Sequence, residues 1–201
     1  MEKRALMKLN KKLKTADAER DLKLAISAGD EQSFELLYNE YNKRLLSFAK
    51  LIVKSKELAE EIVEDVFVKL WCNRETIPAI NGLRLYLYTA TKNHSLNTLA
   101  KKSNRITTSS IELLELDFYT SFSDPHDQLI TSEMMKKMQM AIEELPDRCK
   151  LIFKLVREDG LKYKEVSEIL DISVNTIDNQ MAIAVKRICS ALNISKDRIV
   201  Q

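Results

Sequence analysis

Residues 163–188 read YKEVSEILDISVNTIDNQMAIAVKRI, and their apolar spacing is the strongest structural signal in this chain. The spacing predicts a short helix, a tight turn over residues 171–173 and a longer helix that begins at Val174. Asp171 occupies the turn position where a left-handed backbone is usual, and Asp tolerates that backbone better than most residues do. Ser173 is placed to cap the second helix with its hydroxyl group. These features together predict a helix-turn-helix.

The second helix of this motif is amphipathic. Ile177, Met181, Ala184 and Ile188 form the predicted buried stripe, which leaves polar side chains outward near the N-terminal end. Amide and carboxylate side chains suit base edges in the major groove of DNA, and cations further along the helix suit phosphates. We therefore expect a DNA-reading surface made of Asn175, Thr176, Asp178, Asn179, Gln180, Lys186 and Arg187. The alternative is an ordinary helical hairpin with a polar face.

The charge balance of this region argues against an independent DNA-binding module. Residues 161–198 contain six basic and five acidic side chains, so their attraction for phosphate is weak. We expect a larger assembly to hold the module on DNA. The whole chain has 32 basic and 30 acidic residues, and a net charge of +2 by itself indicates neither a nucleic-acid partner nor an acidic one.

The composition predicts an all-α protein, since only three glycines and three prolines occur among 201 residues. An apolar stripe from Phe34 to Ile52 predicts a core helix. Ser55 can cap the next helix, whose first turns are rich in glutamate. Residues 73–82 lose the helical period and read as a loop, after which a third helix is expected over residues 83–102.

An acidic segment divides the chain. No Lys or Arg occurs between Ile106 and Glu133, whereas Asp, Glu, Ser and Thr are frequent there. We expect this segment to form a flexible acidic linker between two helical domains. The expected organisation is a basic N-terminal tail, a first domain, the linker, a second domain with the helix-turn-helix and a C-terminal tail, over residues 1–19, 20–103, 104–127, 128–193 and 194–201.

The expected helix over residues 83–102 is basic, because no acidic residue occurs between positions 83 and 105. Cations follow a nucleic-acid backbone, aromatic rings stack on unpaired bases and amides hydrogen-bond base edges, so this composition indicates a surface for opened, single-stranded DNA. The candidate residues are Arg84, Tyr88, Lys92, Asn93, Asn97 and Lys101. The alternative for the tyrosines is core packing, which is the commoner role of a tyrosine at helical spacing.

Several function classes are not expected. The three cysteines are widely separated, which indicates neither a disulfide framework nor a zinc site and fits a reducing cytoplasm. His94 and His126 are isolated, so no metal is expected. The sequence contains no phosphate-binding glycine loop and no nucleophile motif, so neither an enzyme nor a cofactor is expected. The sequence contains no run of about eighteen apolar residues, so neither export nor a membrane-spanning helix is expected.

Residues 59–71, AEEIVEDVFVKLW, resemble a helix of the sigma-70 family, and specifically of its short extracytoplasmic-function members. In that family the helix docks on the coiled coil of the largest polymerase subunit. The resemblance implies that core RNA polymerase is contacted by Glu61, Glu64, Asp65, Phe67, Lys69 and Trp71. Glu61 stands where Asp is commoner, and Glu64, which stands where Gln is commoner, makes this face more acidic.

Two further stretches carry the likeness. Residues 86–93, YLYTATKN, are similar to the family helix that captures melted bases of the promoter −10 element, and residues 73–82 would then hold the flipped base. Residues 145–148, LPDR, and the helix-turn-helix resemble the domain that reads the −35 element. The departures there are Ser167 for a usual Ala, Asp171 for a usual Gly and Gln180 for a usual basic residue, which affect promoter preference more than fold.

The resemblance implies a cytoplasmic sigma factor that binds core RNA polymerase, recognises the −35 and −10 elements of promoter DNA and promotes DNA opening without bond-making chemistry. It also implies an anti-sigma factor as a partner, often one anchored in the inner membrane, and requires no stable homo-oligomer. One rival is a dimeric helix-turn-helix regulator that binds closed, palindromic duplex without polymerase. Another is a helical adaptor with protein contacts alone, which would leave the basic stretch over residues 83–105 without a partner.

Overall fold

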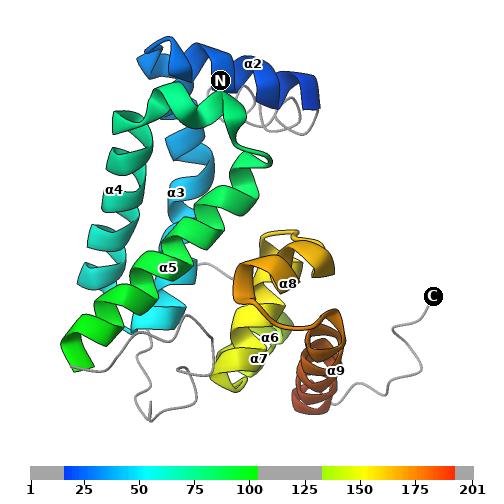
Figure 1. Ribbon diagram of the computed structural model, residues 1–201. Coiled ribbons are helices and arrows are strands. Elements are labelled where there is room, and N and C mark those ends of the chain that lie inside the picture. The colour runs from blue at the N-terminus through cyan, green and yellow to red at the C-terminus, as the bar shows by residue number, and fades with distance from the viewer. Residues whose placement is uncertain (1–15, 104–132, 193–201) are drawn as a thin grey trace. The chain divides into compact units, whose positions relative to one another are not determined.

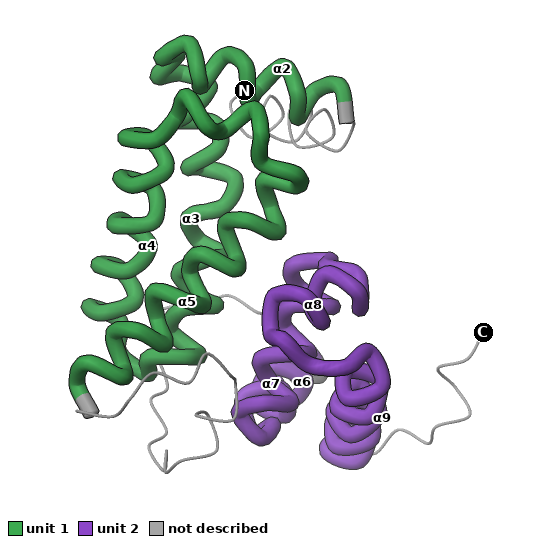
Figure 2. The backbone as a smooth tube through the Cα atoms, viewed as in Figure 1, with its two compact units in different colours: residues 1–107 green, residues 108–201 purple. Residues whose placement is uncertain are grey.

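A computed structural model describes residues 16–103 and 133–192 of the chain, which divides into two compact units (Figure 1, Figure 2). All regular structure in these described ranges is helical, which confirms the predicted all-α fold with two helical domains. The predicted linker, residues 104–127, and the predicted C-terminal tail, residues 194–201, lie outside the described residues.

The first unit consists of α2 (Ala16–Ser27), α3 (Glu31–Val53), α4 (Lys56–Cys72), the 3-10 helix η1 (Arg74–Ala79) and α5 (Leu83–Ser103). Helix α3 packs against both α4 and α5, and α2 packs against α3 and η1 (Figure 1). Because α2 begins at Ala16, the last four residues of the predicted N-terminal tail belong to the first domain instead.

Side-chain caps define the starts of α3 and α4. The carboxylate of Asp30 accepts a hydrogen bond from the backbone N–H of Ser33 at 3.0 Å, at the start of α3. The hydroxyl of Ser55 accepts one from the N–H of Leu58 at 3.3 Å, so the predicted cap of α4 is confirmed. Each bond satisfies a backbone donor that the helix itself leaves without a partner.

The segment predicted as a loop, residues 73–82, contains a short helix. Its 3-10 helix η1 includes Pro78, and Ile77 is fully buried beneath it. A 3-10 helix of this length buries a single apolar side chain, so it leaves no 3.6-residue pattern in the sequence. The prediction of a loop is therefore wrong over residues 74–79, for a reason that periodicity cannot detect.

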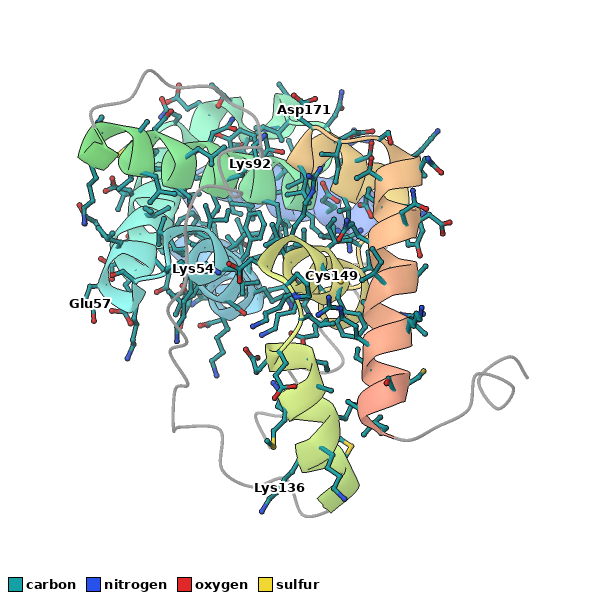
Figure 3. The ribbon with its side chains drawn as sticks, turned by 90° about the horizontal axis from the view of Figure 1, so that it is seen from below. Lys54, Glu57, Lys92, Lys136, Cys149 and Asp171 are labelled. Carbon is teal, nitrogen blue, oxygen red and sulfur yellow. The ribbon has the colours of Figure 1, made fainter. Side chains whose placement is uncertain are left out.

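The second unit consists of α6 (Glu133–Glu143), α7 (Asp147–Phe153), the π-helical turn η3 (Lys154–Glu158), α8 (Tyr163–Leu170) and α9 (Val174–Ala191). The turn between α8 and α9 has Asp171 in the left-handed region, with φ 55° and ψ 48° (Figure 3). Ser173 then caps α9, because its hydroxyl accepts a hydrogen bond from the N–H of Thr176 at 3.0 Å. Both features confirm the predicted helix-turn-helix.

The core of the second unit holds α9 in place. Leu145 and Cys149 pack with Ala184 of α9, and Phe153 and Ile188 flank this cluster. The Cys149 thiol donates a hydrogen bond to the backbone carbonyl of Gln180 at 3.3 Å. Burial raises the pKa of the Cys149 thiol, although Arg187 acts in the opposite direction, so the group stays protonated and remains a donor at neutral pH.

An ion network joins α6 to the following helices. The Nζ of Lys150 lies 3.3 Å from one carboxylate oxygen of Glu143, and the Nζ of Lys154 lies 3.1 Å from the other. Lys150 also donates to the backbone carbonyl of Glu143. Burial raises the pKa of Glu143, but the two ammonium groups outweigh it, and the pKa lies below the usual 4.5.

Replacing Ser55 by Ala is expected to lower the free energy of unfolding of the first unit by about 1 kcal/mol, because the N–H of Leu58 loses its acceptor. Trp71, the only tryptophan of the chain, packs against Phe34 and reports unfolding of this unit through its fluorescence in a urea titration. Ser47→Ala, at an exposed position of α3, serves as the control. Equal shifts in both variants would contradict the capping role.

Docking of α6 is expected to weaken in acid. A carboxyl group whose pKa is lowered on folding stabilises the folded state above its unfolded pKa, here about 4.5, and loses that contribution as the pH falls through the lowered value. Methyl NMR signals of Met135, Met138 and Met140, all exposed on α6, report the docking during titration from pH 6 to pH 3. In Glu143→Gln this step should be absent, and its persistence there would assign it to another group.

Candidate nucleic-acid and protein interfaces

One side of α5 is exposed to solvent and free of acidic groups. Its exposed residues Tyr86, Asn93, Asn97 and Lys101 recur at spacings of seven, four and four, which places them on one side of the helix. The helix contains no Asp or Glu along its whole length. This side therefore presents a ring, two amides and an ammonium group together, as a single-stranded nucleic acid requires.

Tyr88 does not lie on this side, so its predicted place on the nucleic-acid surface is wrong. The residue is fully buried, and its ring centroid lies 5.3 Å from that of Phe48 on α3. Two residues along an α-helix turn by about 200°. Tyr86, which is 41% exposed, therefore takes the outward position that was predicted for Tyr88.

Lys92 is also on the buried side of α5, with 6% of its surface exposed, so its predicted surface position is wrong as well (Figure 3). The buried side is unusually polar, because Thr91 and Ser95 are fully buried there. The Thr91 hydroxyl donates to the backbone carbonyl of Leu87 at 2.8 Å, and within the described residues the Ser95 hydroxyl has no hydrogen-bond partner. An apolar stripe could not reveal a buried side of this composition.

Arg84, in the first turn of α5, is half-buried. Burial raises the pKa of the nearby Tyr41, while the Arg84 guanidinium lowers it. Tyr41 lies on α3, so the Arg84 charge acts on a residue of that helix. Arg84 is less accessible than the exposed residues Tyr86, Asn93, Asn97 and Lys101.

The exposed side of α4 carries most of the residues predicted to bind polymerase. Glu61, Glu64 and Lys69 are exposed, and Asp65 is half-buried. Among them stands Val68, whose side chain is 59% exposed although it is apolar. An exposed apolar side chain within a charged rim is a candidate for contact with another protein, and residue type alone did not single out Val68.

Phe67 is buried, with 3% of its surface exposed, so it lacks the surface position that its predicted contact with polymerase needs. Its ring lies 4.9 Å from Tyr38 and 6.1 Å from Phe34, both on α3. Trp71 is half-buried at the end of this aromatic cluster, 4.8 Å from Phe34, with the Arg74 guanidinium 5.0 Å from its ring. Phe67 and Trp71 fix the rotation of α4 against α3.

A polar contact joins the exposed sides of α4 and α5. The Nε2 of His94 on α5 lies 3.4 Å from a carboxylate oxygen of Asp65 on α4. Burial and the neighbouring Lys69 lower the pKa of His94, against the opposing effect of Asp65. The surroundings of His94 thus disfavour its charged form, although its ring nitrogen lies within ion-pair distance of the Asp65 carboxylate.

Helix α9 presents the predicted DNA-reading residues outward. Asn175, Asp178, Asn179, Lys186 and Arg187 are exposed, as predicted. Thr176 and Gln180 are half-buried toward the flank of the helix.

One residue completes this surface. The exposed Ala182 lies at helical spacing between Asn179 and Lys186, so a methyl group stands in the middle of the polar side of α9. Apolar contact with the methyl group of thymine is one way in which proteins read bases. The sequence reading missed Ala182 because it considered polar side chains alone.

None of the helices that the structure describes is both long and apolar enough to cross a membrane. Among residues 16–103 and 133–192, no group of three or more His, Cys, Asp or Glu side chains is placed to hold a metal ion.

Comparison with known proteins matches both units. Residues 37–105 match the family model of sigma-70 region 2, and residues 135–195 match that of sigma-70 region 4. The chain is 24% identical over 162 residues to the ECF RNA polymerase sigma-E factor of Escherichia coli strain K12, covering 78% of this chain and 84% of that protein. The protein of the same name from Haemophilus influenzae is 23% identical, with 78% and 85% covered.

Two solved structures have a similar fold. The sigma factor RpoE of Bartonella quintana, crystallised with the anti-sigma factor NepR, has a TM-score of 0.55 at 18% identity and covers 82% of this chain and 99% of its own. CnrH in complex with the cytosolic domain of CnrY has a TM-score of 0.52 at 16% identity, with 87% and 96% covered. Together with the two region matches, which span well over half of the sequence, these likenesses show that the chain belongs to the sigma-70 family of RNA polymerase sigma factors, in its extracytoplasmic-function group.

Proposed function

We propose that the two exposed sides of the first unit divide the work of transcription initiation between them. Helix α4 binds core RNA polymerase, and α5 binds the opened strand of the −10 element. The observation that supports this most is the acid-free side of α5, which gathers Tyr86, Asn93, Asn97 and Lys101 in one line. An adaptor that makes only protein contacts would leave this row of side chains without a function.

The −10 surface in this proposal has Tyr86 in place of Tyr88 and Lys92. The exposed ring of Tyr86 is available to stack on an unpaired base, and such stacking contributes about 1–3 kcal/mol per base. Asn93 and Asn97 hydrogen-bond base edges further along, and Lys101 neutralises a phosphate. Stacking and hydrogen bonding together offset the few kcal/mol, roughly, that unpairing a base costs.

The polymerase-binding surface is centred on Val68. Burial of this side chain against a partner removes apolar surface from water, while Glu61, Glu64 and Lys69 at the rim choose the partner by charge. Asp65 also contacts His94 of α5, so this part of the charged rim lies next to α5. Polymerase binding and DNA binding thus use different sides of one packed unit.

The second unit reads the −35 element in duplex form through α9. Asn175 and Asn179 suit adenine, Ala182 suits the methyl group of thymine, and Lys186 suits a phosphate. The exposed side of α9 has few cations, so its own attraction for DNA is weak. Attachment to polymerase supplies the affinity that this unit lacks.

The same reasoning assigns partners and location. Both solved structures named above contain a second protein, which in one of them is an anti-sigma factor. We extend this to the present chain and propose an anti-sigma factor anchored in the inner membrane, with the sigma factor in the cytoplasm. The chain acts by binding alone, as a monomer in the polymerase complex. The rival dimeric regulator is not favoured, because both units match sigma-70 region models.

Reconstitution with core polymerase tests the proposal as a whole. The purified chain, mixed with core polymerase and fragmented genomic DNA, is expected to co-elute with polymerase and to direct discrete run-off transcripts. The −35 and −10 elements of each promoter are then identified in the DNA upstream of the transcript start. Binding of a palindromic duplex by a dimer, with no polymerase affinity, would instead identify the regulator.

Two substitutions are expected to separate the two surfaces. Val68→Glu should weaken binding to core polymerase by roughly tenfold or more, because it places a charge in the centre of an apolar contact. Asn93→Ala should leave polymerase binding intact and lower the yield of open complexes several-fold, through the loss of about 1–2 kcal/mol of base contact. Binding is measured by fluorescence anisotropy and opening by permanganate reactivity of unpaired thymines.

Each variant has a matched control on the same unit. Leu24→Glu changes an exposed apolar residue of α2, and Asn39→Ala changes an exposed amide of α3. Neither control should change polymerase affinity or open-complex yield. Equal loss of both functions in Val68→Glu and Asn93→Ala would show damage to the fold and would count against two separate surfaces.

A further inference from the structure

Helix α2 lies against the junction that leads into α5. Figure 1 shows this blue helix beside the green turn at residues 74–83, and α2 packs against η1 in that turn. Helix α2 precedes residues 37–105, the part of the chain that matches sigma-70 region 2. Two charged side chains from the middle of α2 also contact the backbone of the junction.

Three contacts form this link. The carboxylate of Glu19 accepts a hydrogen bond from the backbone N–H of Leu83 at 3.0 Å. The Nζ of Lys23 donates to the backbone carbonyl of Ile80 at 2.6 Å. The Nζ of Lys23 also lies 3.1 Å from the Glu19 carboxylate, so one ion pair holds both ends of the junction.

The junction needs a partner of this kind. The first N–H groups of α5 have no acceptor within the helix, and the positive end of the helix dipole lies there. A capping side chain usually comes from the residue before the helix, but that residue is Gly82, which has no side chain and a φ of +75°. Glu19 supplies the missing acceptor from a helix 64 positions earlier in the chain.

The location of the link is more informative than its contribution to stability. The side chains of Lys23 and Glu19 are 13% and 32% exposed, and partly exposed ion pairs add little to folding free energy. The unit is anchored separately here by Ile26, Ile77 and Leu83, all of which are buried. Glu19 and Lys23 fix the backbone over residues 80–83. This backbone determines the position of the first turn of α5, which contains Tyr86.

We infer that Glu19 and Lys23 are positioning residues for recognition of the −10 element. They touch no DNA and act by holding residues 80–83 in the shape that aims Tyr86 along the exposed side of α5. This inference rests on the proposed function of α5. It assigns to α2 a role in promoter discrimination that is separate from polymerase binding.

The test compares three substitutions in the full chain assembled with core polymerase. Glu19→Ala removes the acceptor of the Leu83 N–H, and Lys23→Met removes the donor to Ile80 while keeping an unbranched stem. Glu19→Gln retains an oxygen that can accept the same hydrogen bond and serves as the conservative variant. Asp21→Ala, at an exposed position of the same helix, is the matched control.

Three quantities are measured for each variant. Hydrogen exchange reports the backbone over residues 80–87, and fluorescence anisotropy reports affinity for core polymerase. A promoter is first selected from genomic DNA by the wild-type holoenzyme, and single bases of its −10 element are then replaced. Discrimination is the open-complex yield at the selected promoter divided by the yield at the altered promoter. Glu19→Ala and Lys23→Met should exchange faster and lose discrimination by about three- to tenfold, as expected for one lost hydrogen bond, with polymerase affinity unchanged. Glu19→Gln and Asp21→Ala should behave like the wild type.

Other outcomes overturn the inference. Unchanged discrimination in Glu19→Ala and Lys23→Met would show that the junction does not need this link, whatever the exchange rates are. A parallel loss of polymerase affinity would show that the two residues support the fold alone. Failure of the proposed function is recognised separately, because the wild-type chain itself would then give no open complex with core polymerase.

Discussion

The packing of Tyr88 against Phe48 fixes the rotation of α5 about its own axis, and the rest of the first unit depends on that rotation. Because the helix period is 3.6 residues, burial of one side determines which residues face outward. Tyr86, Asn93, Asn97 and Lys101 are exposed together for this reason. If α5 were turned by one residue, these four side chains would no longer face outward together.

A second consequence is that the two candidate surfaces of the first unit are mechanically connected. Helix α4 is fixed on α3 by the ring contacts of Phe67 with Phe34 and Tyr38. The contact between His94 and Asp65, whose nitrogen and oxygen lie 3.4 Å apart, then joins α4 to α5 directly. A protein bound to α4 and a strand bound to α5 would therefore share one scaffold, which suits a factor that must place DNA relative to polymerase.

The helix-turn-helix was predictable because its signals are local. The left-handed turn at Asp171 and the cap at Ser173 depend on residues within a few positions of each other, and the structure has both. The buried stripe of α9 follows the helix period with apolar residues, so its outward residues could also be named. Family resemblance and periodicity agree there, since nothing polar is buried in this helix among the residues that the structure describes.

The first unit was harder to predict, since the buried side of α5 holds Thr91, Lys92 and Ser95, which polarity alone places outside. On α4, Phe67 and Val68 are adjacent and both apolar, and only contact with α3 decides which of them is buried. Local pattern was thus sufficient for the all-α class, the two domains and the helix-turn-helix, because capping and periodicity act over a few residues. Tertiary packing alone determined the rotation of α4 and α5 and the bond from Glu19 to Leu83, because these contacts join residues far apart in the chain.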